Sequence, residues 1–252
     1  MHPRRVTILD LVQNEDRVKV RQLADRFHVS PMTIRRDLSL LEDQGYLVRT
    51  HGGAVVAGRL RFLQRAFPHY TVSKRKAAIG KLAATLVQPG QTVMVDTGTT
   101  ALEVARNLPK DAGITVATTS LCVAQELYGA PLTVLLLGGF LRKEFPSLYG
   151  PLTESLLKGF HVDILFMGCE GADSLQGFYT VDLHISSLEQ ATIEISDRVV
   201  VVTESSKFAR KSFVRYARPE QIDTLVTDAG LSVTDRKNLE KHGIKILFVE
   251  EE

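Results

Sequence analysis

Apolar positions in the first 57 residues recur at the spacing of three short helices. One stripe occupies residues 6–12 and a second occupies residues 23–27. A third consists of Ile34, Leu38 and Leu41, which follow the i, i+4, i+7 spacing of a helix with one buried face. The pattern therefore predicts three helices that share a small core.

The residues on either side of the third stripe predict the start of that helix and a hairpin after its end. Ser30 is a favoured N-cap, and Pro31 suits the first helical position, where a missing N–H costs nothing. Residues 46–50 have the composition of a strand and lead into Gly52-Gly53, after which Val55-Val56 can pair back. We therefore expect a two-stranded wing after the third helix.

Two short helices joined by a tight turn match the helix-turn-helix, whose second helix enters the major groove of DNA. That helix directs Thr33, Arg35 and Arg36 away from the core, and arginine side chains can reach guanine. The pattern alone also allows a small helical subdomain whose arginines are only solvated. The residues expected to contact DNA are Ser30, Met32, Thr33, Arg35, Arg36, Arg49, His51 and Gly52.

Beyond residue 76, apolar strands alternate with amphipathic helices. The predicted strands are 91–96, 114–118, 133–138, 163–168, 198–203, 223–227 and 244–249, and the predicted helices are 101–108, 121–128, 152–158, 187–196 and 234–241. Such alternation favours an α/β fold with a mostly parallel, doubly wound sheet. We expect a winged helix-turn-helix over 1–57, a basic linker over 58–74 and an α/β domain over 75–252.

Five of the predicted strands are followed by loops rich in Ser, Thr and Gly. Each loop alone is more typical of a cap and turn. Ligands bind at the carboxyl ends of parallel strands, where backbone N–H groups and helix N-termini favour anions. Together the loops therefore predict a rim that binds a small hydroxylated anion such as a sugar phosphate. Its candidate residues are Asp96, Thr97, Gly98, Thr99, Thr100, Thr118, Thr119, Ser120, Gly139, Arg142, Glu170 and Lys207.

The charge distribution assigns different partners to the two parts. Residues 1–76 hold 15 Lys and Arg against 7 Asp and Glu, a net charge of +8. Residues 77–252 hold 16 against 22, a net charge of −6. A basic first third on an acidic remainder indicates that an anionic polymer, here double-stranded DNA, binds one end only.

The sequence carries no sign of a membrane segment, an export signal or a metal site. No apolar run reaches the roughly 18–20 residues of a membrane span, and the N-terminus lacks the apolar stretch of a secretory signal. Cys122 and Cys169 are far apart and match no metal spacing. We expect a cytoplasmic protein with two buried thiols and with no metal, cofactor or membrane partner.

Residues 17–54 resemble the DNA-binding signature of the DeoR family of transcription regulators. The similar residues are Leu23-Ala24, Val29-Ser30, Thr33 to Leu38, Leu41-Glu42, Gly45 and His51 to Ala54. The resemblance implies that Thr33, Arg35 and Arg36 lie in the recognition helix. It makes Asp37 a residue that orients this helix, because phosphate would repel a carboxylate.

The second part is similar to the DeoR-type sensor domain, which resembles the ribose-phosphate isomerase and glucosamine-phosphate deaminase fold. The similar residues are Lys76, Asp96 to Thr100, Leu137 to Gly139, Leu141-Arg142, Gly150-Pro151, Asp163 and Ser205 to Phe208. The resemblance implies that residues 97–100 and Lys207 hold a phosphate and that Gly139 and Arg142 line a sugar pocket. It also adds Lys76 to the candidate effector residues.

Four places at the expected pocket depart from the family pattern. The family commonly has Asp where this chain has Glu170 and Glu204, and frequently has Asn where it has Thr119. Residues 182–187 lack the Glu-Ala-like run often found there. These departures leave open a ligand that is larger than the usual hexose phosphate or differently charged.

We expect a repressor of a carbohydrate-metabolism operon whose operator binding changes when an anionic sugar occupies the second domain. Such a ligand must favour the DNA-free state by about 1–3 kcal/mol to change affinity about 5–150-fold, and the same arithmetic allows a ligand that strengthens DNA binding. One winged domain offers a small contact area, so we expect a homodimer or homotetramer on repeated half-sites.

Two other functional classes are weaker. A sugar-phosphate isomerase needs a carboxylate base, for which Glu170 and Asp173 are candidates. However, residues 175–179 replace the lysine–glycine-rich segment of those isomerases. An architectural DNA-binding protein would have no effector pocket, whereas this chain has polar and glycine residues in five loops. No catalytic residue is therefore expected.

Overall fold

The computed structural model describes residues 2–15, 17–43, 46–50, 52–56, 73–142 and 145–249. Contacts divide the chain into two compact units, Met1–His69 and Tyr70–Glu252, and each is described by itself. The predicted linker over 58–74 lies outside the described residues apart from Ser73 and Lys74. The three predicted domain limits therefore stay predictions.

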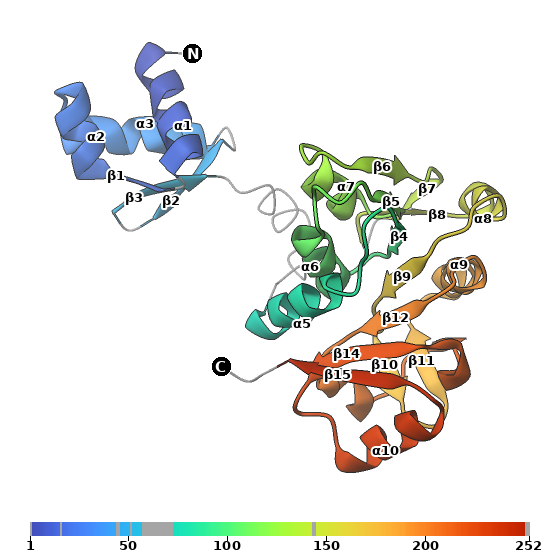
Figure 1. Cartoon of the computed structure of the whole chain (residues 1–252). Helices are drawn as coiled ribbons and strands as arrows, with labels where there is room; N and C mark the ends of the chain where they lie inside the picture. The colour runs from blue at the N-terminus through green and yellow to red at the C-terminus, as the bar shows by residue number, and fades with distance from the viewer. Residues whose placement is uncertain are drawn as a thin grey trace. The chain divides into compact units, whose positions relative to one another are not determined.

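The described residues of the N-terminal unit form three helices and an antiparallel sheet of order β1-β3-β2 (Figure 1). Its elements are α1 (Pro3–Glu15), β1 (Arg17–Lys19), α2 (Val20–Phe27), α3 (Pro31–Asp43), β2 (Leu47–Thr50) and β3 (Gly53–Val56). Ile34, Leu38 and Leu41 are fully buried in one core with Ile8 and Leu47. The predicted helices and hairpin are confirmed, and β1 adds a third strand to the wing.

The C-terminal unit is an α/β domain with two small additional sheets. In chain order its elements are α5 (Lys74–Ala84), β4 (Thr92–Val95), α6 (Thr99–Asn107), β5 (Thr115–Thr118), α7 (Leu121–Leu127), β6 (Thr133–Leu136), β7 (Phe140–Arg142), β8 (Ser147–Tyr149), α8 (Pro151–Leu157), β9 (Ile164–Met167), β10 (Gly171–Asp173), β11 (Gly177–Thr180), α9 (Leu183–Glu194), β12 (Val199–Val202), η1 (Ser205–Ala209), β13 (Val214–Ala217), η2 (Pro219–Gln221), β14 (Thr224–Asp228), α10 (Val233–Lys241) and β15 (Lys245–Val249).

Seven parallel strands of the described residues form the main sheet, in the order β15-β14-β12-β9-β4-β5-β6. Every residue of β9, β12 and β14 is buried, as expected for central strands covered on both faces. Strand β6 is mostly exposed because it lies at the edge. The predicted parallel sheet is confirmed. The chain runs outward from β4 to β6 and then returns to β9, so the strand order reverses between β4 and β9.

Helices cover both faces of this sheet (Figure 1). Helix α5 contacts α6 as well as β12, β14 and β15, and α6 contacts α7. In Figure 1, α8 and α9 lie on the opposite side, and α9 also contacts β11 and β13. No described helix is both long and apolar enough to cross a membrane.

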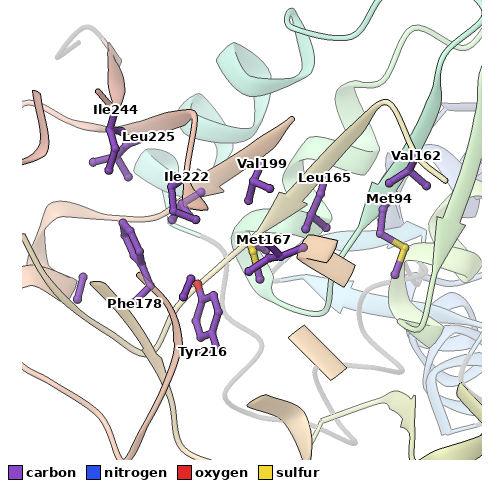
Figure 2. Close-up of a cluster of buried hydrophobic side chains, with 14 of the residues drawn as sticks. Met94, Val162, Leu165, Met167, Phe178, Val199, Tyr216, Ile222, Leu225 and Ile244 are labelled. Atoms are coloured by element: carbon purple, nitrogen blue, oxygen red, sulfur yellow. The ribbon is translucent and has the colours of Figure 1, made fainter. Parts of the chain in front are cut away.

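The antiparallel sheet β10-β11-β13 is a feature that the sequence did not predict. Figure 2 shows how its aromatic residues, Phe178 of β11 and Tyr216 of β13, join the core beside Met167 of β9. Both rings are fully buried, and the Tyr216 hydroxyl donates a 2.6 Å hydrogen bond to the carbonyl oxygen of Gly168. This sheet therefore closes one face of the domain beside the loop that follows β9.

Candidate DNA-binding and effector sites

The turn between α2 and α3 sets the start of the predicted recognition helix. His28 has a φ of 52°, the left-handed conformation that commonly ends a helix. Two residues later, the Ser30 hydroxyl accepts a 3.1 Å hydrogen bond from the Thr33 N–H and lies 2.9 Å from the Thr33 hydroxyl. Ser30 therefore caps α3 as its sequence position predicted.

Helix α3 separates an apolar face from a basic one. Ile34, Leu38 and Leu41 have no exposed surface, whereas Arg35 and Arg36 are exposed. Met32 is 68% exposed and Thr33 is half-buried. The helix thus presents two guanidinium groups outward, which is the arrangement that major-groove recognition requires.

Asp37 is a buried carboxylate that ties α1 to α3. Its two oxygens accept hydrogen bonds from the Nε of Arg4 at 2.7 Å and from the Nε of Arg5 at 2.9 Å. Burial by itself would raise the pKa of Asp37, but the hydrogen bonds from the two arginines outweigh it and hold the pKa below 3.8. Asp37 therefore orients α3 and is not available to DNA.

The wing is attached to the recognition helix through Arg49. Its guanidinium donates a hydrogen bond to the Ser39 hydroxyl of α3, and its backbone N–H donates one to Glu42 at 2.9 Å. Arg49 and Gly52 are exposed, as a contact with DNA would require. His51 lies outside the described residues.

In the C-terminal unit, the five predicted loops follow β12, β9, β4, β5 and β6, which are neighbours in the sheet. Asp96 follows β4 and Glu170 follows β9, so these two side chains stand where the strand order reverses. Open α/β sheets bind ligands at such a point. Thr97, Gly98 and Thr99 are partly exposed there and lead into α6, while Thr100 is buried.

The loop after β12 is held by contacts with the start of α5 and with the end of β14. Glu204 accepts a hydrogen bond from the Ser73 hydroxyl at 3.0 Å and lies 3.9 Å from the Lys76 ammonium. Asp228 accepts from both the N–H and the hydroxyl of Ser205. This arrangement brings Lys76 and Lys207 to the same loop. Burial raises the pKa of the Cys169 thiol to about 12, and the nearby Lys207 partly opposes that rise.

The loop after β5 turns inward. Thr118, Thr119 and Ser120 are at most 1% exposed. The Thr118 hydroxyl donates to the carbonyl oxygen of Val95 at 2.6 Å, and the Ser120 hydroxyl accepts from the Val123 N–H to cap α7. These hydroxyls serve internal hydrogen bonds, so the arrangement gives no support to their predicted contact with a ligand.

In the segment after β6, Gly139 is exposed whereas Arg142 is buried. A Cβ on Gly139 would lie 2.2 Å from the Thr153 hydroxyl and 2.5 Å from the carbonyl oxygen of Tyr149, so close packing requires glycine. Arg142 is only 8% exposed, lies 3.8 Å from Asp182, and has its guanidinium 4.7 Å from the centre of the Phe145 ring.

The structure adds two acidic residues that the sequence did not single out. Asp182 caps α9 by accepting the His184 N–H at 2.9 Å, and Glu189 is 5% exposed on the same helix. Burial raises the pKa of Glu189 well above 4.5, and Asp96 and Glu170 raise it further. The sequence did contain an indication that Glu189 is buried, because it lies four residues from both Ile185 and Ile193 and so shares the apolar face of the helix.

A groove of about 640 Å³ lies elsewhere in this unit, between the β7–β8 hairpin, α9 and β13. Its walls include Phe140, Tyr149, Leu183 and His184, with Glu154 and Arg215 as charged residues. None of the predicted effector residues lines it. The groove and the polar rim are therefore different features of the unit.

Both units match families of known proteins. A DeoR-like helix-turn-helix domain matches residues 4–59, and the DeoR C-terminal sensor domain matches residues 71–229. The chain belongs to the DeoR family. It is a DNA-binding transcription regulator and not an enzyme, which confirms the function class expected from its sequence.

Several DeoR-type regulators align with almost the whole chain. The HTH-type transcriptional regulator GlpR of Haloferax volcanii is 36% identical over 97% of this chain and 96% of its own length. The transcriptional repressor AccR of Agrobacterium fabrum is 35% identical over 90% and 89%. The glycerol-3-phosphate regulon repressor of Escherichia coli K12 is 31% identical over 95% of each.

Solved structures with a related arrangement match more weakly. The full-length sorbitol operon regulator SorC from Klebsiella pneumoniae is 14% identical over 93% of this chain and 97% of its own, with a TM-score of 0.39. Ribose 5-phosphate isomerase A from Methanocaldococcus jannaschii is 20% identical over 52% of each chain, with a TM-score of 0.38.

Proposed function

We propose that this DeoR-family regulator represses a carbohydrate-metabolism operon and leaves its operator when a phosphorylated sugar binds the C-terminal unit. The outward placement of Arg35 and Arg36 on α3, opposite a fully buried apolar face, carries the proposal for DNA. The named relatives support repression, since two of those above are described as repressors.

The polar rim supports a sugar-phosphate effector. Thr97 to Thr99 lead into the N-terminus of α6, where the helix dipole favours an anion. Lys76 and Lys207 bring ammonium groups to the loop after β12, a strand that β9 separates from β4 in the sheet. A ligand held there must favour the DNA-free state by about 1–3 kcal/mol to weaken operator binding about 5–150-fold.

We further propose that the protein acts in the cytoplasm as a homodimer or homotetramer and needs no cofactor. One winged domain contacts little DNA, whereas two copies on repeated half-sites add their contacts. The groove between β7, α9 and β13 is a suitable surface for a second copy. Phe140 and Leu183 are 66% and 65% exposed at its walls, and Glu154 and Arg215 can pair across a two-fold axis.

The test begins with selection of an operator from a random duplex pool by the full-length protein. We expect Arg35→Ala and Arg36→Ala each to weaken operator binding about ten-fold or more and to relax the selected sequence, as loss of a base contact does. Lys237→Ala, an exposed cation on α10, is the matched control. Unchanged affinity and salt dependence in both arginine variants would refute the recognition-helix assignment.

The effector is tested on the same operator complex by fluorescence anisotropy with a panel of sugar phosphates and the corresponding unphosphorylated sugars. We expect a phosphorylated sugar to release the DNA and Lys207→Ala to require a higher concentration of it. A ligand that tightens the complex would make the protein a co-repressor-dependent regulator. No response to any phosphorylated sugar would refute the proposed effector class.

A further inference from the structure

Four carboxyl groups converge where the strand order of the main sheet reverses. Asp96 and Glu170 follow the adjacent strands β4 and β9, and α9 contributes Asp182 at its N-cap and Glu189 about two helical turns further on. Glu189 interacts electrostatically with Asp96, Glu170 and Asp182. The centre of the rim is therefore acidic, although its outer loops suit an anion.

Arg142 is the cation that acts on both Asp96 and Glu189 among the described residues. Its guanidinium lies 3.8 Å from Asp182, and its Nε has no hydrogen-bond partner among the described residues. The Oε2 atom of Glu189 is also unpaired, and both side chains are more than nine-tenths buried. Buried polar atoms without partners are costly, so a site that leaves both unpaired indicates that a polar ligand belongs there.

The charges that act on Asp96 and Glu189 include one guanidinium group against several carboxyl groups. Lys76 lies 3.9 Å from Glu204, and Lys207 lowers the pKa of Cys169. No three His, Cys, Asp or Glu side chains of the described residues are arranged to hold a metal ion. A positive charge on the ligand would therefore match this cluster of carboxyl groups better than a neutral group would.

We propose that the effector is a phosphorylated sugar that carries a protonated amino group, with its ammonium held by Asp96 and Glu170. This inference rests on the proposed function, because it specifies the ligand of the same rim. Asp96 and Glu170 are partly exposed and can reach the ammonium, whose positive charge would in turn favour the ionised form of the buried Glu189. The phosphate lies at the N-terminus of α6, which begins three residues after Asp96.

An ammonium group suits this site better than a hydroxyl does. A hydroxyl offers one donor and no charge, whereas an ammonium offers three donors and a full positive charge. Burial, together with the nearby Glu170, raises the pKa of Asp96 to about 7, and a bound ammonium group would favour the ionised form of this carboxylate.

Matched ligands separate the amino group from the rest of the sugar. Isothermal titration of the full-length protein at pH 7 compares glucosamine 6-phosphate, glucose 6-phosphate and N-acetylglucosamine 6-phosphate, and then the same three in the galactose series. We expect the amino sugar phosphate of one series to bind about ten-fold or more tightly than its hydroxyl and N-acetyl counterparts, as one charge-assisted hydrogen bond predicts.

Two variants of α9 test the residue assignment. We expect Glu189→Gln, which keeps the shape of the side chain, to reduce the preference for the amino sugar several-fold. Glu194→Gln on the same helix, where the side chain is exposed, should leave it unchanged. Glu170→Gln provides a second variant in a loop if Glu189→Gln alters thermal unfolding.

The outcomes distinguish this inference from the proposed function. If glucose 6-phosphate or galactose 6-phosphate binds and releases DNA as well as its amino counterpart, the ammonium site is refuted while the sugar-phosphate effector stands. An undiminished preference in both Glu189→Gln and Glu170→Gln would also refute the ammonium site. If no phosphorylated sugar of either series binds, the proposed effector function fails together with the inference.

Discussion

Two carboxylates in this protein show how the same residue type takes opposite electrostatic roles. Asp37 lies between the guanidinium groups of Arg4 and Arg5, which outweigh its burial and lower its pKa. Asp96 is raised to a pKa of about 7 by burial and by Glu170, against a backbone hydrogen bond from Thr97 and the field of Arg142. Asp37 therefore stabilises its unit as an ion, whereas burial and Glu170 outweigh the groups that favour ionised Asp96.

The raised pKa of Asp96 predicts a pH-dependent stability difference. Between about pH 4 and 7 the folded protein keeps a proton that the unfolded chain has lost, so the Asp96 contribution to the free energy of unfolding falls as pH rises. Asp96→Asn removes this contribution. We therefore expect the free energy of unfolding of the variant minus that of the parent, measured with urea, to increase from pH 4 to 7 and then to level off.

The control for this measurement is Asp111→Asn, at an exposed position outside the rim. Its unfolding profile over the same pH range is the reference against which the Asp96→Asn profile is compared. A difference between Asp96→Asn and the parent that stays constant from pH 4 to 7 would contradict the raised pKa of Asp96.

Among the elements, the wing depends on a close approach that only glycine permits. Strands β1 and β3 pair with Lys19 opposite Gly53. A Cβ on Gly53 would lie 1.8 Å from the carbonyl oxygen of Val18, whereas a Cβ on Gly52 would meet nothing within 4 Å. The two adjacent glycines, equivalent in sequence, therefore have different structural requirements.

We expect Gly53→Ala to destabilise the N-terminal unit by about 1–3 kcal/mol, because β1 must move away from β3 to admit the methyl group. Gly52→Ala should change stability by less than about 0.5 kcal/mol. Thermal unfolding of the two variants, with operator affinity measured on each, checks both values. Equal effects of the two substitutions would contradict the pairing of β1 with β3.

Helix boundaries illustrate what element-level patterns miss. The sequence predicts a helix over 187–196, whereas α9 spans Leu183–Glu194 because Asp182 caps it. The earlier start places Asp182 beside Arg142, and Glu189 of the same helix interacts electrostatically with Asp96 and Glu170. In residues 182–187 the apolar Leu183 and Ile185 alternate with polar residues, a spacing that does not by itself predict the first turn of a helix.

At the scale of the whole molecule, the proposed function requires that DNA contacts, effector binding and assembly act together. The described groove with Phe140 and Leu183 at its walls is the surface that we propose for a second copy. We expect sedimentation velocity to give a mass above that of the monomer. Replacing both residues by aspartate should shift the mass toward the monomer and weaken operator binding, because one winged domain then binds alone.

The matched control is Tyr128→Asp, since Tyr128 is 88% exposed and does not line the groove. It should keep the parent's mass and operator affinity. An unchanged mass after both groove substitutions would exclude this groove as the interface, and a monomeric parent protein would refute the proposed assembly.

The sequence by itself determined the local structure and the class of the protein. Apolar periodicity located the three N-terminal helices and all seven strands of the main sheet, because burial of one or both faces imposes a regular spacing on apolar residues. The order of residues from Arg17 to Ala54 and the polar loops of the second part carried the resemblance to the DeoR family, which the comparisons confirmed.

Only the tertiary structure decided which polar residues meet. Asp37 is separated by 33 residues from Arg4, and Asp182 by 40 from Arg142, so no local pattern could pair them. The structure turned Thr118 and Ser120 inward and brought Glu189 to the rim, because the sheet order and the packing of α9 fix where each side chain lies. Sequence spacing records which residues a helix or strand buries. The partners of buried charges depend on contacts between elements far apart in the chain.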